Sequence, residues 1–145
     1  MSSTTLAAAP QLDLDNAFFW EGLAQGRFLV QRCTSCGRVR FPPTPGCPGC
    51  GEVGSEAVAS SGEGSVYSWV VVHRAFSPAF ADDVPYTVAT IELDEGCRVL
   101  ARLELASAEP SFGMRVRVDY RERRREDGAE WTEAFFRSAA QEKGS

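Results

Sequence analysis

Apolar and polar residues alternate over much of the second half of the chain, and this pattern predicts β-strands. The segment CRVLARLEL places Val99, Ala101, Leu103 and Leu105 on one face and mostly charged residues on the other. The segment RVRVDYRER, residues 115–123, alternates in the same way. A period of two residues is typical of a strand that buries only one of its faces.

Turn residues divide this half of the chain into five or six short strands. The other predicted strands are SVYSWVVVHRAF, YTVATIEL and AEWTEAFFRSA, and the segments DEG, SAEPSFGM and REDG separate neighbouring strands. A region of about 80 residues is short for a sandwich, which needs about 100 residues, and suits a small barrel. The predicted fold class is therefore mainly β, with a five-stranded barrel of the oligonucleotide/oligosaccharide-binding (OB) type over residues 53–139.

Residues 15–32, DNAFFWEGLAQGRFLVQR, predict a short helix followed by a lead-in strand. Asp15 or Asn16 is a suitable cap, and Gly26 is placed to end the helix in the left-handed conformation. Phe18, Phe19 and Trp20 give the helix a strongly apolar surface. A helix of about three turns is too short to be stable alone in water, so it must pack on its own domain or on another chain.

Four of the five cysteines lie in one segment, CTSCGRVRFPPTPGCPGC, residues 33–50. Two residues between cysteines allow one tight turn to present two sulfur atoms to the same ion, and structural zinc takes four such ligands tetrahedrally. The predicted ligands of one Zn²⁺ ion are Cys33, Cys36, Cys47 and Cys50. Short strands beside the two cysteine turns make residues 33–52 a predicted zinc ribbon.

Other uses of these cysteines are compatible with the same spacing. Four thiolates also bind iron, which would imply electron transfer. A redox-active dithiol would need only one of the two pairs. Because four cysteine ligands complete the coordination shell, no position is left for water or substrate, and the predicted role of the metal is structural.

Composition and charge narrow the functional classes. The chain has 145 residues and a formal net charge of −5, which argues against binding nucleic acid mainly through its phosphates. No run of 18 apolar residues is present, and residues 1–14 lack the features of a secretory signal. We expect residues 1–14 and 140–145 to be disordered tails and the protein to be cytoplasmic, without a membrane or nucleic-acid partner.

The order of these motifs resembles that of a known family. An aromatic helix around FFWEGL precedes RCTSCGRVRFPPTPGCPGCG, which precedes SGEGSVYSWVVVHRAFSPAF, PYTVATIELDEG and FGMRVRVDY. This order is similar to that of the small zinc-ribbon/OB-fold proteins associated with acyl-CoA enzymes, over residues 16–137. The resemblance implies a rubredoxin-like ribbon and a thiolase-fold partner, such as a thiolase, a synthase or a steroid side-chain retro-aldolase. It also implies a CoA thioester as the shared substrate.

Several residues are candidates for contact with such a partner or with acyl-CoA. The helix offers Phe18, Phe19 and Trp20, and the loop HRAFSPAFADDVP offers Phe76 and Phe80 beside His73 and Arg74. His73 is the only histidine, and Cys97 is the only cysteine outside the cluster. A catalytic use of either is conceivable, but a lone histidine or cysteine is more often structural.

The sequence thus predicts a non-catalytic accessory subunit, not an enzyme on its own, within an acyl-CoA thiolase or aldolase complex as a hetero-oligomer. One alternative is a single-stranded nucleic-acid-binding module, because zinc ribbons and OB barrels both serve that role. Another is a self-sufficient acyl-CoA enzyme that uses His73 or Cys97. The acyl group is left open by the sequence.

Overall fold

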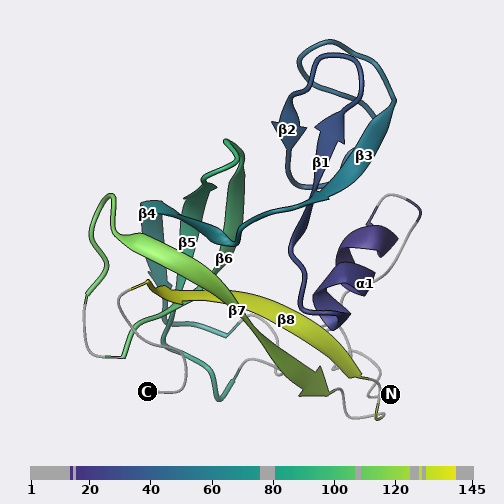
Figure 1. The fold of residues 1–145 in the computed structure, drawn as a ribbon. Helices are drawn as coiled ribbons and strands as arrows, with labels where there is room; N and C mark the ends of the chain where they lie inside the picture. The colour runs from purple at the N-terminus through teal and green to yellow at the C-terminus, as the bar shows by residue number, and fades with distance from the viewer. Residues whose placement is uncertain are drawn as a thin grey trace.

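The computed structural model describes residues 14, 16–75, 81–106, 109–124, 128 and 130–139. Over these residues the chain forms one helix and eight strands (Figure 1). In order these elements are α1 (Ala17–Ala24), β1 (Leu29–Cys33), β2 (Val39–Arg40), β3 (Ser55–Ala59), β4 (Glu63–Val72), β5 (Tyr86–Leu93), β6 (Arg98–Glu104), β7 (Arg115–Arg124) and β8 (Glu130–Ser138).

The first three strands form a small antiparallel sheet in the order β2-β1-β3, which we call the ribbon sheet. All five residues of β3 pair with β1, from Leu29 opposite Ala59 to Cys33 opposite Ser55. The predicted start of the barrel at residue 53 falls before β3, whereas the strands of the closed barrel begin at Glu63. β3 therefore belongs to the ribbon sheet.

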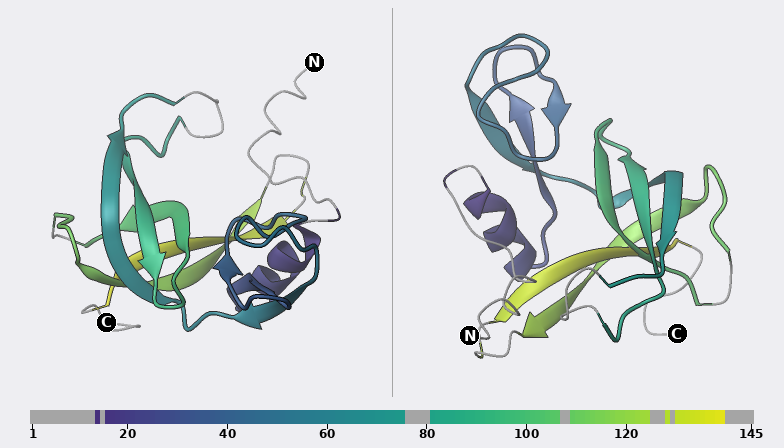
Figure 2. Two further views of the ribbon diagram at one scale, coloured as in Figure 1. Left: turned by 90° about the horizontal axis from the view of Figure 1, so that it is seen from above. Right: turned by 180° about the vertical axis from the view of Figure 1, so that it is seen from behind.

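The other five strands close into a barrel in the order β4-β5-β6-β8-β7, as the five-stranded OB-type prediction requires. The β6–β8 pairing is parallel and the other pairings are antiparallel. Closure depends on three residue pairs between β4 and β7, which join residues 63–65 to residues 115–117. The ribbon sheet and α1 lie on one side of this barrel (Figure 2).

Several inward positions predicted from the alternating pattern are buried, whereas Ala101, Leu105, Val118 and Tyr120 are half-buried. Leu103 and Val99 of β6 are each 3% exposed, and Val116 of β7 is fully buried. Ile91 and Leu93 of β5 complete this row on the neighbouring strand. The period-two pattern therefore placed Val99, Leu103 and Val116 on the buried face of their strands.

The helix is held between the ribbon sheet and the barrel by aromatic side chains. Phe19 is buried, and its ring centroid lies 5.2 Å from those of both Phe28 and Phe41. Phe28 in turn lies 6.2 Å from Phe136 of β8. Gly26 follows the helix with φ +75°, as predicted, whereas the side chain of Asn16 makes no capping hydrogen bond. Helix, ribbon sheet and barrel thus share one apolar core.

Gly64 allows β4 and β5 to approach closely. A Cβ atom at this position would clash with the backbone carbonyl of Glu92 on β5. We expect Gly64→Ala to lower the free energy of unfolding by about 1–3 kcal/mol, because the backbone must shift to relieve the overlap. Denaturant unfolding measures this change. Gly46→Ala is the matched control, since its Cβ would lie 3.9 Å from the nearest atom, and equal losses in the two variants would contradict the prediction.

Candidate functional site

The four clustered cysteines converge as their spacing predicts. Cys33 ends β1, Cys36 lies in the turn before β2, and Cys47 and Cys50 lie in the loop between β2 and β3. All four sulfur atoms lie within 4.8 Å of one another, with Cys33 3.5 Å from Cys50 and Cys36 3.7 Å from Cys47. A tetrahedral zinc ion with Zn–S bonds of ~2.3 Å separates its sulfur ligands by ~3.8 Å. The observed set therefore fits a zinc ion.

The two cysteine turns are near copies of each other. The N–H of Gly37 donates to the carbonyl of Cys33 at 2.9 Å, and the N–H of Gly51 donates to the carbonyl of Cys47 at 2.8 Å. Both glycines have positive φ, +80° and +83°. A residue with a side chain would be strained there, so glycine after each pair lets the backbone fold around the sulfur atoms.

Backbone N–H groups stabilise the thiolate forms of two ligands. The N–H groups of Cys36 and Ser35 lower the pKa of Cys33. The N–H groups of Cys50 and Gly49, the latter 3.3 Å from the sulfur, lower the pKa of Cys47 to about 6, against the effect of burial. Against the lowering effect of the Glu52 N–H group, the sulfur of Cys33, together with burial, raises the pKa of Cys50. Backbone N–H groups therefore favour the ionised form of Cys33 and Cys47, and metal binding completes deprotonation of the set.

A second feature is apolar and lies on the outer face of the barrel. Leu100 on β6 is 71% exposed, and Val70 on β4 is 60% exposed. The strand between them is β5, on which Val88 pairs with Val70. Sequence reasoning missed this surface. The available signal was Leu100 itself, an apolar residue between Arg98 and Arg102 in an otherwise charged outward row. We call Val70, Val88 and Leu100 the outer apolar face.

The outer apolar face continues into a groove of about 420 Å³ between α1 and the barrel. The helix and ribbon sheet supply one wall, and β5, β6 and β8 supply the other. Its lining is mainly apolar and aromatic: Phe19, Trp20, Leu23, Phe28, Phe41, Tyr86, Val88, Val99, Leu100, Ala101, Arg102, Trp131, Glu133 and Ala134.

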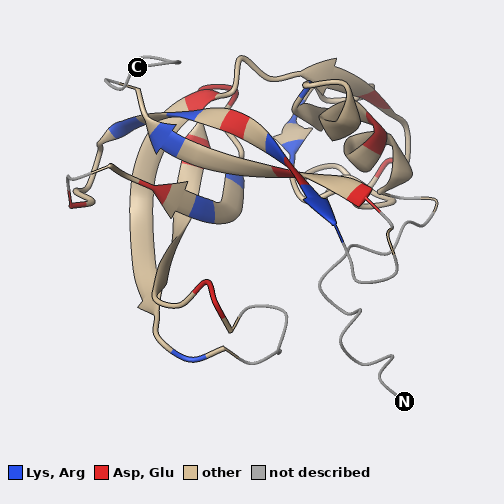
Figure 3. Cartoon of the chain, turned by 90° about the horizontal axis from the view of Figure 1, so that it is seen from below, with Lys and Arg blue, Asp and Glu red and all other residues tan. Residues whose placement is uncertain are grey.

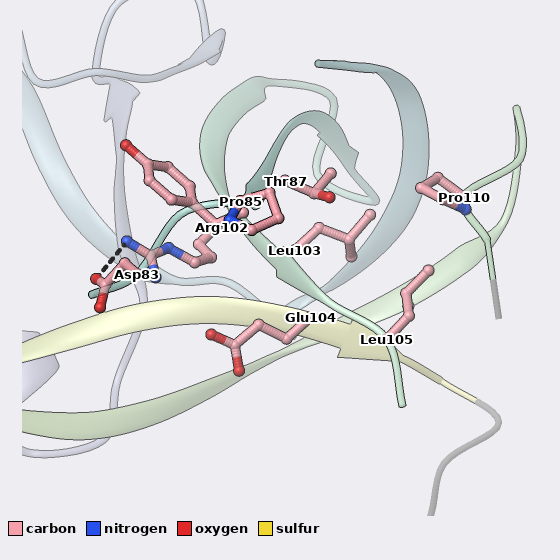
Figure 4. Close-up of a pocket in the computed structure, with 9 residues that line it drawn as sticks. Asp83, Pro85, Thr87, Arg102, Leu103, Glu104, Leu105 and Pro110 are labelled. Carbon is pink, nitrogen blue, oxygen red and sulfur yellow. Dashed lines mark hydrogen bonds and ion pairs between the residues drawn. The ribbon is translucent and has the colours of Figure 1, made fainter. Parts of the chain in front are cut away.

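A smaller and more polar pocket of about 330 Å³ adjoins this groove and shares Tyr86 and Arg102 with it. Figure 4 shows the Arg102 guanidinium directed toward Asp83, to which it donates at 3.2 Å. The same guanidinium lies 4.1 Å from the centre of the Tyr86 ring. These contacts hold Arg102 in the wall between the groove and the smaller pocket.

The predicted contact residues of the helix differ in accessibility. Phe19 is only 7% exposed and packs inside the chain, so we leave it out of any contact surface. Trp20 is half-buried and contacts Trp131 at 6.0 Å between ring centroids, and Phe18 is also half-buried. His73 and Arg74 are exposed after the end of β4, and Phe76 and Phe80 lie outside the described residues.

Cys97 and His73 do not form a catalytic pair. Cys97 lies beside the β5–β6 turn, and its carbonyl accepts a hydrogen bond from the N–H of Leu93. Leu93 pairs with Gly64, so this turn lies at the end of the barrel where β4 begins. His73 follows the last residue of β4 at the opposite end. Burial, with a contribution from Glu95, raises the pKa of the Cys97 thiol to about 11. A buried thiol that stays protonated near neutral pH is a poor nucleophile.

Acidic partners engage many of the arginines on the barrel. Arg115 donates to both carboxylate oxygens of Asp94, at 3.0 and 2.8 Å, and this contact lowers the pKa of Asp94. Arg121 pairs with Glu104 and with Glu133. Basic and acidic residues accordingly intersperse along the barrel strands (Figure 3). Because these arginines are paired with carboxylates, less positive charge is available to bind a polyanion such as nucleic acid.

The fold and the cysteine site together define a zinc-ribbon/OB-fold protein. Two family models match the chain: "ChsH2, rubredoxin-like zinc ribbon domain" over residues 20–53 and "ChsH2, C-terminal OB-fold domain" over residues 57–121. A DUF35 domain-containing scaffold protein of Methanocaldococcus jannaschii is 39% identical over 112 residues, which cover 75% of this chain and 78% of that protein. The chain belongs to this DUF35 family of ChsH2-type zinc-ribbon/OB-fold proteins, which includes scaffold proteins and subunits of larger enzymes.

Two further comparisons are informative. A solved structure described as "Ltp2-ChsH2(DUF35) aldolase" superimposes with a TM-score of 0.77 at 39% identity, covering 91% of this chain and all of that chain. The 3-oxo-4,17-pregnadiene-20-carboxyl-CoA hydratase alpha subunit of Mycobacterium tuberculosis is 39% identical over 114 residues, 77% of this chain. This chain spans 35% of that subunit's length and 36% of a probable enoyl-CoA hydratase alpha subunit of Thermomonospora curvata.

Within the part of the chain that the structure describes, no helix has the length and apolar character needed to cross a membrane.

Proposed function

We propose that this chain is a non-catalytic accessory subunit that docks onto a thiolase-fold enzyme acting on acyl-CoA thioesters. The observation that carries the proposal is the outer apolar face, where Leu100 and Val70 are 71% and 60% exposed. Clustered exposed apolar side chains beside an apolar groove mark interaction surfaces in small soluble domains. A partner that covers this face would remove it from water.

The relatives support an acyl-CoA enzyme as that partner. The benzoylsuccinyl-CoA thiolase subunit BbsA of Thauera aromatica is 35% identical over 77 residues, half of this chain. The solved relative is described as an aldolase that combines Ltp2 with ChsH2(DUF35). By analogy, this chain would complete a thiolase or an aldolase, with steroid side-chain degradation as one setting.

The chemistry of the described residues favours a non-catalytic role for this chain. The four cysteines fill the coordination shell of their metal, and Cys97 is buried with a raised pKa. We therefore place the bond-breaking residues in the partner. The ion pairs of Arg115 and Arg121 favour this proposal over the nucleic-acid alternative, which requires free positive charge. None of the five cysteines forms a disulfide, which suits the reducing cytoplasm, where we place the complex.

A charged substitution on the outer apolar face tests the proposal. We expect Leu100→Asp to weaken binding to the thiolase-fold partner enzyme at least ~30-fold, because about 2 kcal/mol is typical of an interface hot spot. Co-expression with size-exclusion chromatography detects the complex, and calorimetric titration gives the affinity. An acyl-CoA cleavage assay on each chain alone and on the mixture should find activity only when the partner is present.

Val53→Asp provides the matched control. Val53 is 75% exposed but lies before β3, away from the outer apolar face, so this variant should bind the partner like the original chain. Both variants should retain one zinc ion per chain, which verifies the ribbon. Unchanged binding by Leu100→Asp, or turnover by this chain alone, would contradict the proposal.

A further inference from the structure

We propose that two copies of this chain associate through the free edge of β3, so that the three strands of one ribbon sheet continue into the three strands of the other. This inference goes beyond the proposed function and does not rest on it, because no enzyme is required. It adds an interaction surface on the ribbon sheet, and the occupant of that surface is an identical chain.

β3 forms an open edge of the ribbon sheet. Among the strands that the structure describes, only β1 pairs with it. The outer edge of β3 lies on the side of the ribbon sheet that faces away from the barrel (Figures 1 and 2). Proline and lysine commonly protect such edges, but β3, with the sequence SEAVA, contains neither, and four of its five residues are exposed. The edge is therefore accessible to another strand.

The hydrogen bonds between β1 and β3 determine which backbone groups of β3 face outward. The N–H of Ser60 donates to the carbonyl of Phe28, and the N–H of Thr34 donates to the carbonyl of Gly54. Both bonds continue the β1–β3 register, so the even-numbered residues of β3 direct their N–H and carbonyl groups toward β1. The residues whose N–H and carbonyl groups point away from β1 are Ser55, Ala57 and Ala59.

This arrangement makes the edge complementary to itself. A two-fold axis at Ala57 would place each Ala57 opposite the Ala57 of the second copy, and each Ser55 opposite the Ala59 of the second copy. Antiparallel residues whose backbone groups face each other exchange both of their N–H to carbonyl hydrogen bonds. The pairing would therefore satisfy every outward N–H and carbonyl group of β3 in both copies, and two-fold contacts of this kind are the commonest in homo-oligomers.

The side chains fit the same pairing. Positions 55, 57 and 59 carry only serine or alanine, so a second strand can approach without steric conflict. The intervening positions would place Glu56 opposite the Val58 of the second copy, so that like charges are not directly opposed. Glu56 also accepts from Nε of Arg32 at 2.8 Å within its own chain, which offsets its charge.

The length of the edge sets the strength of this contact. A strand of five residues buries less than the about 1,200 Å² that is usual for a stable complex, so the dimer is weak, with a dissociation constant on the order of 0.1 mM. The outer apolar face lies on β4, β5 and β6 and not on the ribbon sheet, so it stays free in the dimer. Each dimer would thus present two docking faces to an enzyme.

Charge substitutions at Ala57 test the two-fold register. Because Ala57 faces its own copy across the axis, Ala57→Lys and Ala57→Asp should each weaken self-association at least ~10-fold through repulsion of like charges. An equimolar mixture of the two variants should associate at least as tightly as the original chain, since opposite charges then face each other. Sedimentation velocity of the zinc-loaded full chain, without an enzyme partner and at concentrations up to about 1 mM, measures the association.

Isotope-filtered NMR on a mixture of labelled and unlabelled chains locates the contact. The pairing brings the Cα atoms of Glu56 and of Val58 in the second copy to about 4.5 Å, so a nuclear Overhauser effect should join their Hα atoms between chains. Ala57→Pro removes an outward N–H that makes no bond to β1, so it should abolish this signal and keep one zinc ion per chain. Ala57→Ser retains the N–H and a small side chain and is the matched control.

Three results would overturn the inference. A chain that stays monomeric at about 1 mM has no such contact. Association that Ala57→Lys leaves unchanged lies on another surface, and a mixture of the two charged variants that stays monomeric rules out the two-fold register. Leu100→Asp should dimerise like the original chain, so loss of the enzyme partner with the dimer intact would bear on the proposed function alone. Loss of self-association in Leu100→Asp would place the contact on the outer apolar face and also overturn the inference.

Discussion

Replacing Cys47 with serine should release the metal and unfold the ribbon sheet. The serine hydroxyl is a poor ligand, and the other three thiols would remain crowded without a cation to neutralise them. Metal binding to zinc-finger peptides contributes about 10–16 kcal/mol, far more than a small three-stranded sheet can gain from its own burial. Elemental analysis should find less than about one tenth of a zinc ion per chain in this variant, against about one in the original chain.

Cys97→Ser provides the control for this experiment. Cys97 lies in the barrel core, apart from the cysteine cluster, so its replacement should leave the zinc content unchanged. Backbone NMR spectra should lose the dispersed signals of residues 29–59 in Cys47→Ser and keep them in Cys97→Ser. One tightly held zinc ion in the Cys47→Ser chain would contradict the four-ligand site, and iron in the original chain would identify the alternative metal.

Phe28→Ala should have the second large effect, a loss of about 3–5 kcal/mol in the free energy of unfolding. Phe28 is 4% exposed and its ring contacts those of Phe19, Phe41 and Phe136. These contacts come from α1, the ribbon sheet and the barrel, so the resulting cavity would weaken the junction of all three. Denaturant unfolding of the zinc-loaded chain, followed by tryptophan fluorescence and circular dichroism, measures the change.

Phe112→Ala is the matched control for that loss. Phe112 is 77% exposed and contacts Trp69, so its truncation should cost less than about 1 kcal/mol. Two separate unfolding transitions in the original chain, with only one of them shifted by Phe28→Ala, would show that ribbon and barrel do not share a cooperative core.

Local patterns explain why much of this protein was predictable. The segment YTVATIEL corresponds to β5, Tyr86–Leu93, because alternation and the flanking turns are properties of neighbouring residues. The spacing within each Cys-x-x-Cys pair is equally local, and it brought Cys33, Cys36, Cys47 and Cys50 within reach of one ion. The closed five-stranded barrel followed from strand number and length.

Long-range packing determined what the local patterns could not. The β3 segment SEAVA is compatible with either sheet, and only its register against β1 assigns it to the ribbon sheet. The aromatic helix was correctly expected to pack on something, but the choice between its own domain and another chain depended on Phe28, Phe41 and Phe136 meeting Phe19.

The sequence by itself determined the ribbon, the metal-binding cysteines and the strands of the barrel, because each depends on the period or spacing of adjacent residues. Tertiary structure alone decided that Phe19 is enclosed and that α1 and the outer face of β5 and β6 enclose a groove. The physical reason is that the burial of a side chain depends on contacts between residues far apart in the sequence, and a local pattern carries no information about those contacts.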